Sequence, residues 1–184
     1  MNQNHNQNNK VRKVEVIPYQ EDWKEKFENE AELIKMILKS EIIDIYHIGS
    51  TSIPNMSAKP IIDIMVSVHS IDDIDQFNQQ FRESGYIPMG EHGIPLRRFF
   101  YKEENGIRVA HIHIFDQKSA DIERHLNFRD YMITHPIEAL QYSQLKETLA
   151  KKYPTDMESY IQGKHDFIQE MDRKAAEWKK AVER

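Results

Sequence analysis

The sequence contains no cysteine among its 184 residues, which excludes a disulfide framework and any metal site built on thiolates. No run of apolar residues approaches the ~20 that a membrane-spanning helix needs, so no membrane association is predicted. Residues 1–9 lack the apolar stretch of a secretory signal. Together these absences predict a cytoplasmic protein.

Several common catalytic and nucleotide-binding motifs are also missing. The sequence has no Gly-x-Gly-x-x-Gly, no His-Glu-x-x-His and no Ca²⁺-binding loop. It has no P-loop either, because the spacing Gly-x-x-x-x-Gly-Lys-Ser/Thr is missing. Lys59 lies beyond a proline, and no second glycine precedes it. These absences exclude the ordinary dinucleotide-binding, zinc-protease and P-loop classes.

The charge balance is mildly acidic. The chain has 25 Lys and Arg against 30 Asp and Glu, which gives a formal net charge of -5. Proteins that coat nucleic acid collect cations to displace counterions from phosphates, and here the basic residues are scattered without an aromatic stripe. The composition therefore favours a small phosphorylated ligand in a local basic pocket over polymeric nucleic acid.

Length and composition predict one folded domain preceded by a tail. Hydrophobic residues make up 39% and charged residues 30%, an ordinary globular balance, and 184 residues suit a single core. Residues 1–10 are mostly Asn and Gln and have too few apolar side chains to pack, so we expect a disordered tail. The domain is then 11–184, and its oligomeric state is not predicted.

Apolar and β-branched residues predict the strands. We expect strands at 14–17 and 42–48, and a central strand at 61–68 whose nearly continuous apolar run suits burial on both faces. Residues 97–102 and 107–115 flank an Asn-Gly turn and should pair as an antiparallel hairpin.

Apolar residues that recur every three or four positions predict the helices. One such stripe extends from Trp23 to Leu38, and a shorter one occupies residues 73–84. From Asp121 onward two prolines divide the sequence into three helices, the last of which is expected to run through residues 160–178. The chain is therefore an α+β protein that ends in a helical layer.

Gly49-Ser50-Thr51-Ser52 is the first candidate site, because it directly follows a predicted strand. Glycine at such a junction lets the backbone approach a ligand, while neighbouring hydroxyls and amides offer donors to phosphate. The alternative is an ordinary strand-to-loop turn in which a hydroxyl caps the next segment.

Asp63 interrupts the apolar central strand. A carboxylate there is costly to bury unless it is paired, hydrogen-bonded or bound to a metal. Lys59 lies four residues earlier, on the same side of an extended chain, so a Lys-Asp pair is one interpretation and a catalytic or metal-binding role is the other.

His111 and His113 are alternate residues of one predicted strand and therefore share a face. Two imidazoles so placed can ligate one metal ion or contact one phosphate. The alternative is that both histidines are half-exposed and have no function, their spacing reflecting only the alternation of side chains along the strand. Arg98 on the preceding strand adds a cation. Arg129 is available either to a cleft or to surface ion pairs.

These segments, in this order, resemble the GrpB family from about residue 14 to the last helix. The motifs that carry the resemblance are Val16-Ile-Pro-Tyr19, His47-Ile-Gly-Ser-Thr-Ser52, Ala58-Lys-Pro-Ile-Ile-Asp-Ile64, Arg98-Phe-Phe100, His111-Ile-His113 and His125-Leu-Asn-Phe-Arg-Asp-Tyr131 with His135-Pro136.

The resemblance implies a nucleotidyltransferase-like mixed β-sheet with flanking helices. It also implies a Gly-Ser loop on nucleotide phosphates and carboxylates that hold a divalent metal such as Mg²⁺, Mn²⁺ or Zn²⁺ for in-line transfer. Gly49 and Ser50 match that loop, but Met65 stands where a second carboxylate is expected. One transition metal held by Asp63 and imidazole, or no metal at all, then competes with a two-Mg²⁺ site.

Two hypotheses follow from the resemblance. In the first, the protein is a transferase acting on a nucleotide or other phosphorylated small molecule, and the likeness of the family to a domain fused to dephospho-coenzyme A kinase suggests coenzyme A or nucleotide metabolism. In the second, it is a noncatalytic module that kept the phosphate cradle and lost the carboxylates. The expected phosphate-binding residues are Gly49, Ser50, Thr51, Lys59, Arg98 and Arg129, and the expected catalytic or metal-binding residues are Asp63, His111 and His113.

Overall fold

The computed structural model describes residues 13–183, so the predicted tail over residues 1–10 lies outside the described part of the chain. The centre of the folded domain is a five-stranded sheet in the order β1-β2-β5-β4-β3. Strands β2 and β5 are parallel and the other neighbouring pairs are antiparallel, so the predicted mixed sheet is confirmed. The strands are β1 (Ile42–Ile48), β2 (Ile62–Val68), β3 (Tyr86–Pro88), β4 (Arg97–Glu104) and β5 (Ile107–Asp116).

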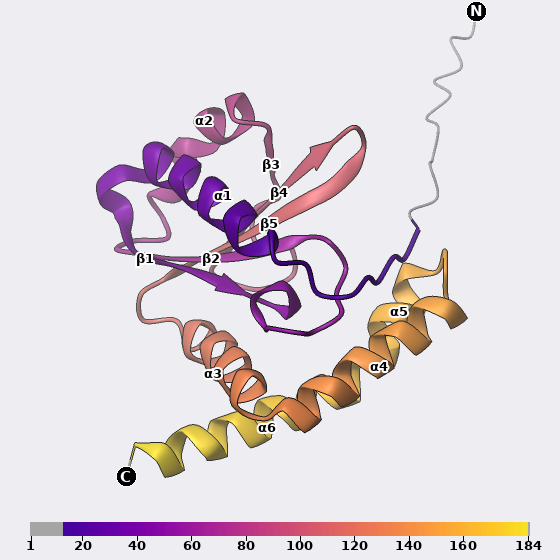
Figure 1. Ribbon diagram of the computed structural model, residues 1–184. Helices are drawn as coiled ribbons and strands as arrows, with labels where there is room; N and C mark the ends of the chain where they lie inside the picture. Colours follow the sequence, from indigo (N-terminus) through magenta and orange to yellow (C-terminus); the bar gives the residue numbers. More distant parts are fainter. Residues whose placement is uncertain (1–12, 184) are drawn as a thin grey trace, which may run out of the picture.

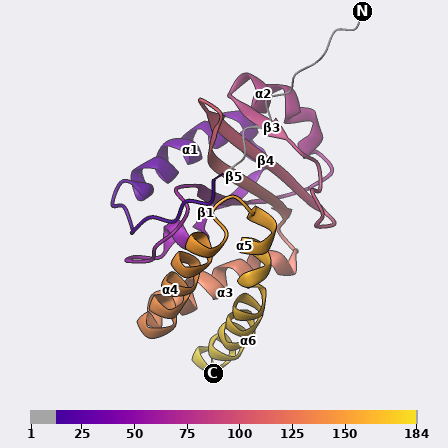
Figure 2. The ribbon, with the colours of Figure 1, turned by 90° about the vertical axis from the view of Figure 1, so that its right-hand side faces the viewer.

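Helices cover both faces of the sheet. Helices α1 and α2 lie on one side, and α3 to α6 form a separate layer on the other (Figures 1 and 2). The predicted C-terminal helical layer is therefore confirmed. The helices are α1 (Trp23–Leu38), α2 (Asn78–Glu83), α3 (Ala120–Thr134), α4 (Pro136–Lys152), α5 (Met157–Gly163) and α6 (His165–Val182).

The two faces of β2 have different environments. Ile62 and Ile64 point into the main core beneath α1, and both are at most 2% exposed. The alternate residues Asp63 and Met65 point to the opposite face because side chains of a strand alternate. Met65 packs there with Phe115 of β5, in a small cluster that also includes residues of α3. The sheet thus separates a large apolar core from a face that carries the polar candidate residues.

Two expected elements differ from the structure. The strand predicted at 14–17 is reduced to a single bridge between Ile17 and Ala58. The helix predicted through residues 160–178 is divided into α5 and α6. Gly163 ends α5 with no side chain toward α4, where a Cβ atom would lie 2.5 Å from Leu149 Cδ2. The close approach explains why the position lacks a side chain, and the low helix propensity of glycine favours a break there.

One short strand, β3, has no counterpart among the predicted elements. It adds three residues to the edge of the sheet beside β4. None of the helices in the described part of the chain is both long and apolar enough to cross a membrane.

Candidate functional site

A cavity of about 360 Å³ lies between one face of the sheet and the helical layer. We call it the central cavity. Its sheet side includes Gly49, Ser50, Thr51, Lys59, Asp63 and His111, and its helical side includes Arg124, His125, Phe128, Tyr142, Lys146, Tyr160, Ile161, Lys164, Ile168 and Asp172.

The loop after β1 approaches the cavity through Gly49. This residue has φ of 70°, and a Cβ atom built on it would lie only 2.6 Å from Asp63 Oδ2. Only glycine therefore allows this backbone to come so close to the carboxylate. The turn that follows is held by a 2.6 Å hydrogen bond from Ser52 Oγ to the Gly49 carbonyl and by a 2.9 Å hydrogen bond between His47 Nε2 and Thr51 Oγ1.

The register of the parallel strands places Asp63 directly beside His111. His111 Nδ1 lies 3.0 Å from Asp63 Oδ1, and His113 Nε2 lies 3.9 Å from the same oxygen. One ligand atom from each of the three residues lies within 4.8 Å of the other two, so the residues that were expected to converge do converge. Asp63 and His111 line the central cavity, and His113 lies next to them on β5.

The hydrogen bonds of this cluster indicate where its protons are. Burial alone would raise the pKa of Asp63, but the 3.0 Å hydrogen bond from His111 and the proximity of His113 outweigh it and hold that pKa far below its usual range. The ionised carboxylate can only accept hydrogen bonds, so His111 Nδ1 donates to it. Burial lowers the pKa of His113, which is therefore neutral at physiological pH.

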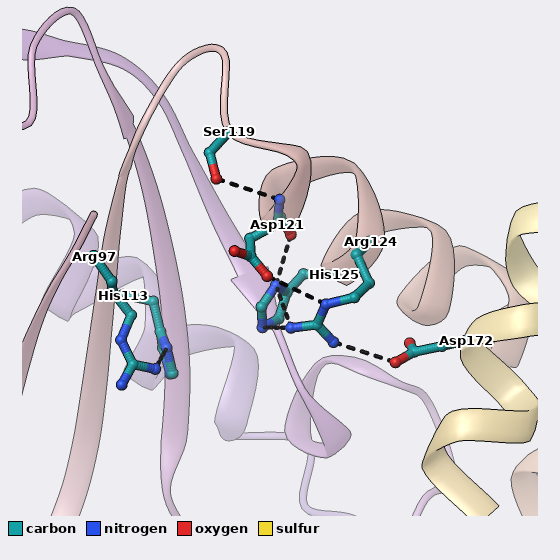
Figure 3. A network of polar contacts seen from close by, with 7 residues as sticks. All are labelled: Arg97, His113, Ser119, Asp121, Arg124, His125 and Asp172. Carbon is teal, nitrogen blue, oxygen red and sulfur yellow. Dashed lines mark hydrogen bonds and ion pairs between the residues drawn. The ribbon is translucent and has the colours of Figure 1, made fainter. Parts of the chain in front are cut away.

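Arg97 determines which nitrogen of His113 carries the proton. Its Nη1 lies 3.3 Å from His113 Nδ1 (Figure 3), and a guanidinium can only donate. His113 Nδ1 is therefore the acceptor, and the proton of the neutral ring is on Nε2, which faces Asp63. Both imidazole nitrogens that face Asp63 thus carry hydrogen.

In this proton arrangement His113 has no lone pair on the side of Asp63, whereas Nε2 of His111 keeps one and has no hydrogen-bond partner among the described residues. A metal needs a lone pair from each imidazole, and a metal-binding histidine usually donates its outer N–H to a carboxylate or carbonyl. The outer nitrogen of His113 instead meets a cation. Met65, which stands where the sequence resemblance implies a second carboxylate, is fully buried. Asp63, His111 and His113 are close enough to hold a metal, but as arranged they form a hydrogen-bonded cluster around one carboxylate.

Three lysines make the rest of the cavity strongly basic. Lys146 is only 2% exposed, and its Nζ is buried with no hydrogen-bond partner within residues 13–183. Lys146 Nζ lies 4.4 Å from the ring centroid of Tyr142, and the Nζ atoms of Lys59 and Lys164 lie 5.5 Å and 4.6 Å from that of Tyr160.

Burial and the positive charge of a neighbouring lysine lower the pKa values of two of these lysines. Burial, with the charge of Lys164, lowers the pKa of Lys146 to about 7. Burial, with the charge of Lys59, lowers the pKa of Lys164 to about 8. Mutually repelling, desolvated ammonium groups on the wall of a cavity are stabilised by an anion that enters it.

Two arginines that were expected to bind phosphate lie elsewhere. Arg98 donates to both carboxylate oxygens of Asp75, at 2.8 Å and 2.9 Å. Arg129 pairs with Asp130 at 2.7 Å and donates to the His47 carbonyl at 3.2 Å. Both guanidinium groups therefore already have anionic or carbonyl partners, and neither residue lines the central cavity.

Lys146 and Lys164 were not among the predicted site residues. Lysines ordinarily face solvent, so their presence alone carried no signal. A signal did exist for Lys146, because Tyr142, Lys146 and Leu149 share the spacing of one buried helical stripe and all three are buried. A lysine within such a buried stripe indicates that its charged group faces a polar site inside the protein.

Residues 13–174 match the sequence family described as GrpB protein. The chain belongs to the GrpB family. Among its relatives is the UPF0157 protein YqkA of Bacillus subtilis, which is 49% identical over 169 residues. That match covers 92% of this chain and 49% of YqkA, so the chain spans about half the length of that relative.

Other GrpB proteins match over nearly their whole length. The glutamate-rich protein GrpB of Alkalihalophilus pseudofirmus is 36% identical, and the match covers 88% of this chain and 96% of the relative. The crystal structure of GrpB from Enterococcus faecalis superposes with a TM-score of 0.84 and 40% identity, covering 88% of this chain and 96% of that one. The Cid1 poly(U) polymerase aligns with a TM-score of 0.45 and 13% identity, over 72% of this chain and 45% of that chain.

Proposed function

We propose that this GrpB protein binds a phosphorylated small molecule of the nucleotide class in its central cavity. The observation that carries the proposal is the buried ammonium of Lys146, which lacks a hydrogen-bond partner in the described chain and lies on the cavity wall with Lys59 and Lys164. Such a group destabilises the unliganded protein, and a bound phosphate chain would both neutralise it and accept its hydrogen bonds.

The loop after β1 would hold the other side of the phosphate. The positive φ of Gly49 brings the backbone of this loop close to the cavity, where the amides at the start of the loop would be available to an anion. The Thr51 hydroxyl is engaged by His47 at 2.9 Å, so we assign the side-chain contact to Ser50. Gly49 and Ser50 keep their expected phosphate-binding role in this proposal, and Thr51 becomes a residue that fixes the turn.

Transfer of a phosphoryl or nucleotidyl group is a second candidate function. It is favoured by the position of Asp63, an ionised carboxylate on the cavity wall beside the loop, which would accept the proton of an attacking hydroxyl. The lowered pKa of Asp63 makes it a weak base, and Met65 replaces the second carboxylate of a two-metal site. Ligand binding is therefore better supported than transfer.

Isothermal titration calorimetry with inorganic tripolyphosphate and with ATP tests the binding proposal. Lys164→Met should weaken both ligands at least about tenfold, because it removes a desolvated charge from the phosphate site. Lys151→Met, an exposed lysine on α4, is the matched control and should leave both affinities unchanged. Equal tripolyphosphate affinity in the wild type and in Lys164→Met would refute the phosphate site.

The transfer reaction has its own test. Release of ADP or pyrophosphate from ATP, with formation of the phosphorylated or nucleotidylated acceptor, would establish transfer if it is abolished in Asp63→Asn while ATP still binds. Binding of ATP without any turnover would identify the protein as a binding module.

A further inference from the structure

The central cavity has an acidic group as well as lysines. Asp172 on α6 lines the cavity and pairs through Oδ2 with Nη1 of Arg124 on α3, at 3.3 Å (Figure 3). The other carboxylate oxygen, Oδ1, is buried and has no hydrogen-bond partner among the residues that the structure describes. Burial raises the pKa of Asp172. The residue lines the cavity, so a small rotation of its side chain would bring this unsatisfied acceptor to a donor on a ligand, a contact that would be strongly favoured.

Helix α6 and the residue before it present three kinds of side chain to the cavity in a fixed order. Lys164, Ile168 and Asp172 are four residues apart, so they lie on one helical face, and all three line the cavity. With a rise of 1.5 Å per residue, Lys164 and Asp172 are about 12 Å apart along the helix. This length is comparable with that of a mononucleotide from its phosphates to its base.

The middle of the cavity suits a flat ring. Phe128 on α3 lines it together with Ile161 and Ile168, and the Phe128 ring packs edge-on against Tyr142 with a centroid distance of 6.1 Å. Aromatic and branched apolar side chains bury a planar heterocycle well, because the ring loses little conformational freedom when it is bound. A sugar phosphate would leave this apolar middle in contact with polar hydroxyls.

We propose that Asp172 is a specificity-determining residue that accepts a hydrogen bond from an amino group on the base of a bound nucleotide. This rests on the phosphate site proposed above. The lysines hold the phosphates, Phe128 and Ile168 contact the base, and Asp172 Oδ1 meets the exocyclic N–H. An ionised carboxylate only accepts hydrogen bonds, so a base with a carbonyl oxygen at that position is repelled and one with an amino group is selected.

Calorimetry with nucleotide pairs that differ at the amino group tests this assignment. The pairs are CTP and UTP, ATP and purine riboside triphosphate, and GTP and ITP, with inorganic tripolyphosphate as a probe that has no base. In at least one pair the wild type should bind the amino-bearing member about tenfold more tightly, the usual effect of leaving a buried polar group unpaired. Asp172→Asn should remove or reverse that preference and leave tripolyphosphate affinity unchanged.

Asp121→Asn is the matched control. Asp121 lies 3.3 Å from the same Arg124 but does not line the cavity, so its loss disturbs the arginine without touching the base. It should keep the wild-type preference, and melting temperatures of both variants should show that they fold.

Three outcomes would overturn the assignment. One is equal affinity within all three nucleotide pairs in the wild type, another is a preference that survives in Asp172→Asn, and the third is a preference lost equally in Asp121→Asn. If tripolyphosphate binds normally in these cases, the phosphate site stands and only the base-recognition proposal fails. If neither tripolyphosphate nor any nucleotide binds, both fail.

Discussion

At the scale of single residues, Gly49 combines a positive φ with a close approach to Asp63. In Gly49→Ala the new Cβ would lie 2.6 Å from Asp63 Oδ2, so the loop or the carboxylate must move. Gly93 also has a positive φ, of 84°, but has nothing within 4 Å of a Cβ position. Gly93→Ala should therefore cost about 1 kcal/mol of unfolding free energy through backbone strain alone, and Gly49→Ala should cost clearly more.

Urea unfolding of the two glycine variants measures this difference. Gly49→Ala should also lose tripolyphosphate binding, while Gly93→Ala should retain it. Equal destabilisation by the two substitutions would mean that the contact with Asp63 is unimportant.

Lys146 should make stability depend on pH. Its pKa is lowered from 10.5 to about 7 in the folded protein, chiefly by burial, so the folded state binds this proton more weakly than the unfolded state does. The resulting penalty is full below pH 7 and disappears as the pH rises toward 10.5. Lys146→Met should therefore stabilise the protein at pH 6, by an amount on the order of 2 kcal/mol, and much less at pH 9.5.

Urea midpoints of wild type and Lys146→Met at these two pH values provide the measurement. Lys151→Met, on the exposed side of α4, is the control and should show no comparable gain at either pH. If the increase in unfolding free energy from Lys146→Met does not shrink with rising pH, its cause is better packing of methionine and not the removal of a buried charge.

Sequence patterns indicated the residues on the sheet side of the candidate site but not those on its helical side. Gly49 was recognisable from its junction, and Asp63 from the cost of a carboxylate in an apolar strand. The partner of Asp63 was harder to predict, because His111 lies 48 residues away and meets it only through the register of two parallel strands. Arg98 was misplaced because its partner, Asp75, lies in a different segment of the chain.

At the scale of elements, α3 depends on a cap at its N-terminus. Ser119 has extended backbone angles, and its side chain accepts a 3.3 Å hydrogen bond from the Asp121 amide. Ser119→Ala should lower the free energy of unfolding by about 1 kcal/mol. Because α3 carries Arg124, the same variant should also loosen the pairing of that arginine with Asp172.

Thermal and urea unfolding test the cap, with Ser119→Asp as the control. Aspartate keeps an acceptor at the N-cap and places a negative charge at the positive end of the helix dipole, so it should retain or exceed wild-type stability. Loss of stability in both variants would show that Ser119 acts through packing.

Local patterns identified most elements because each has a strong periodicity. The strand predicted at 42–48 coincides with β1, and the predicted hairpin corresponds to β4 and β5. The prediction of a strand at 14–17 was wrong, because the backbone groups of this segment bond to different parts of the chain. Val14 N donates to the Pro154 carbonyl, whereas Ile17 N donates to the Ala58 carbonyl. A strand needs a continuous partner, and sequence alone does not identify one.

At the scale of the whole molecule, the central cavity lies between two structural layers, and a ligand in it should stabilise both. The layers are already joined where Ser57 Oγ donates to Glu147 Oε1 at 2.6 Å and the Ser57 amide donates to Ser143 Oγ at 3.1 Å. We expect saturating tripolyphosphate to slow amide hydrogen exchange both in residues 49–52 and in α4 to α6.

Hydrogen exchange measured by mass spectrometry, with and without tripolyphosphate, tests this expectation. Strand β3, at the edge of the sheet away from the cavity, provides an internal reference whose exchange should change least. Protection confined to the helical layer would show that the anion does not bridge to the loop after β1.

The sheet order also has a consequence for synthesis on the ribosome. Strand β2 pairs with β1 on one side and with β5 on the other, and β5 is the last strand of the sheet to be made. At 5–20 residues per second, β2 waits roughly 2 to 10 s for that partner. During this interval a nearly fully buried strand has an open edge in the nascent chain, so we expect newly made protein to depend on chaperones that bind before Asp116 has left the exit tunnel.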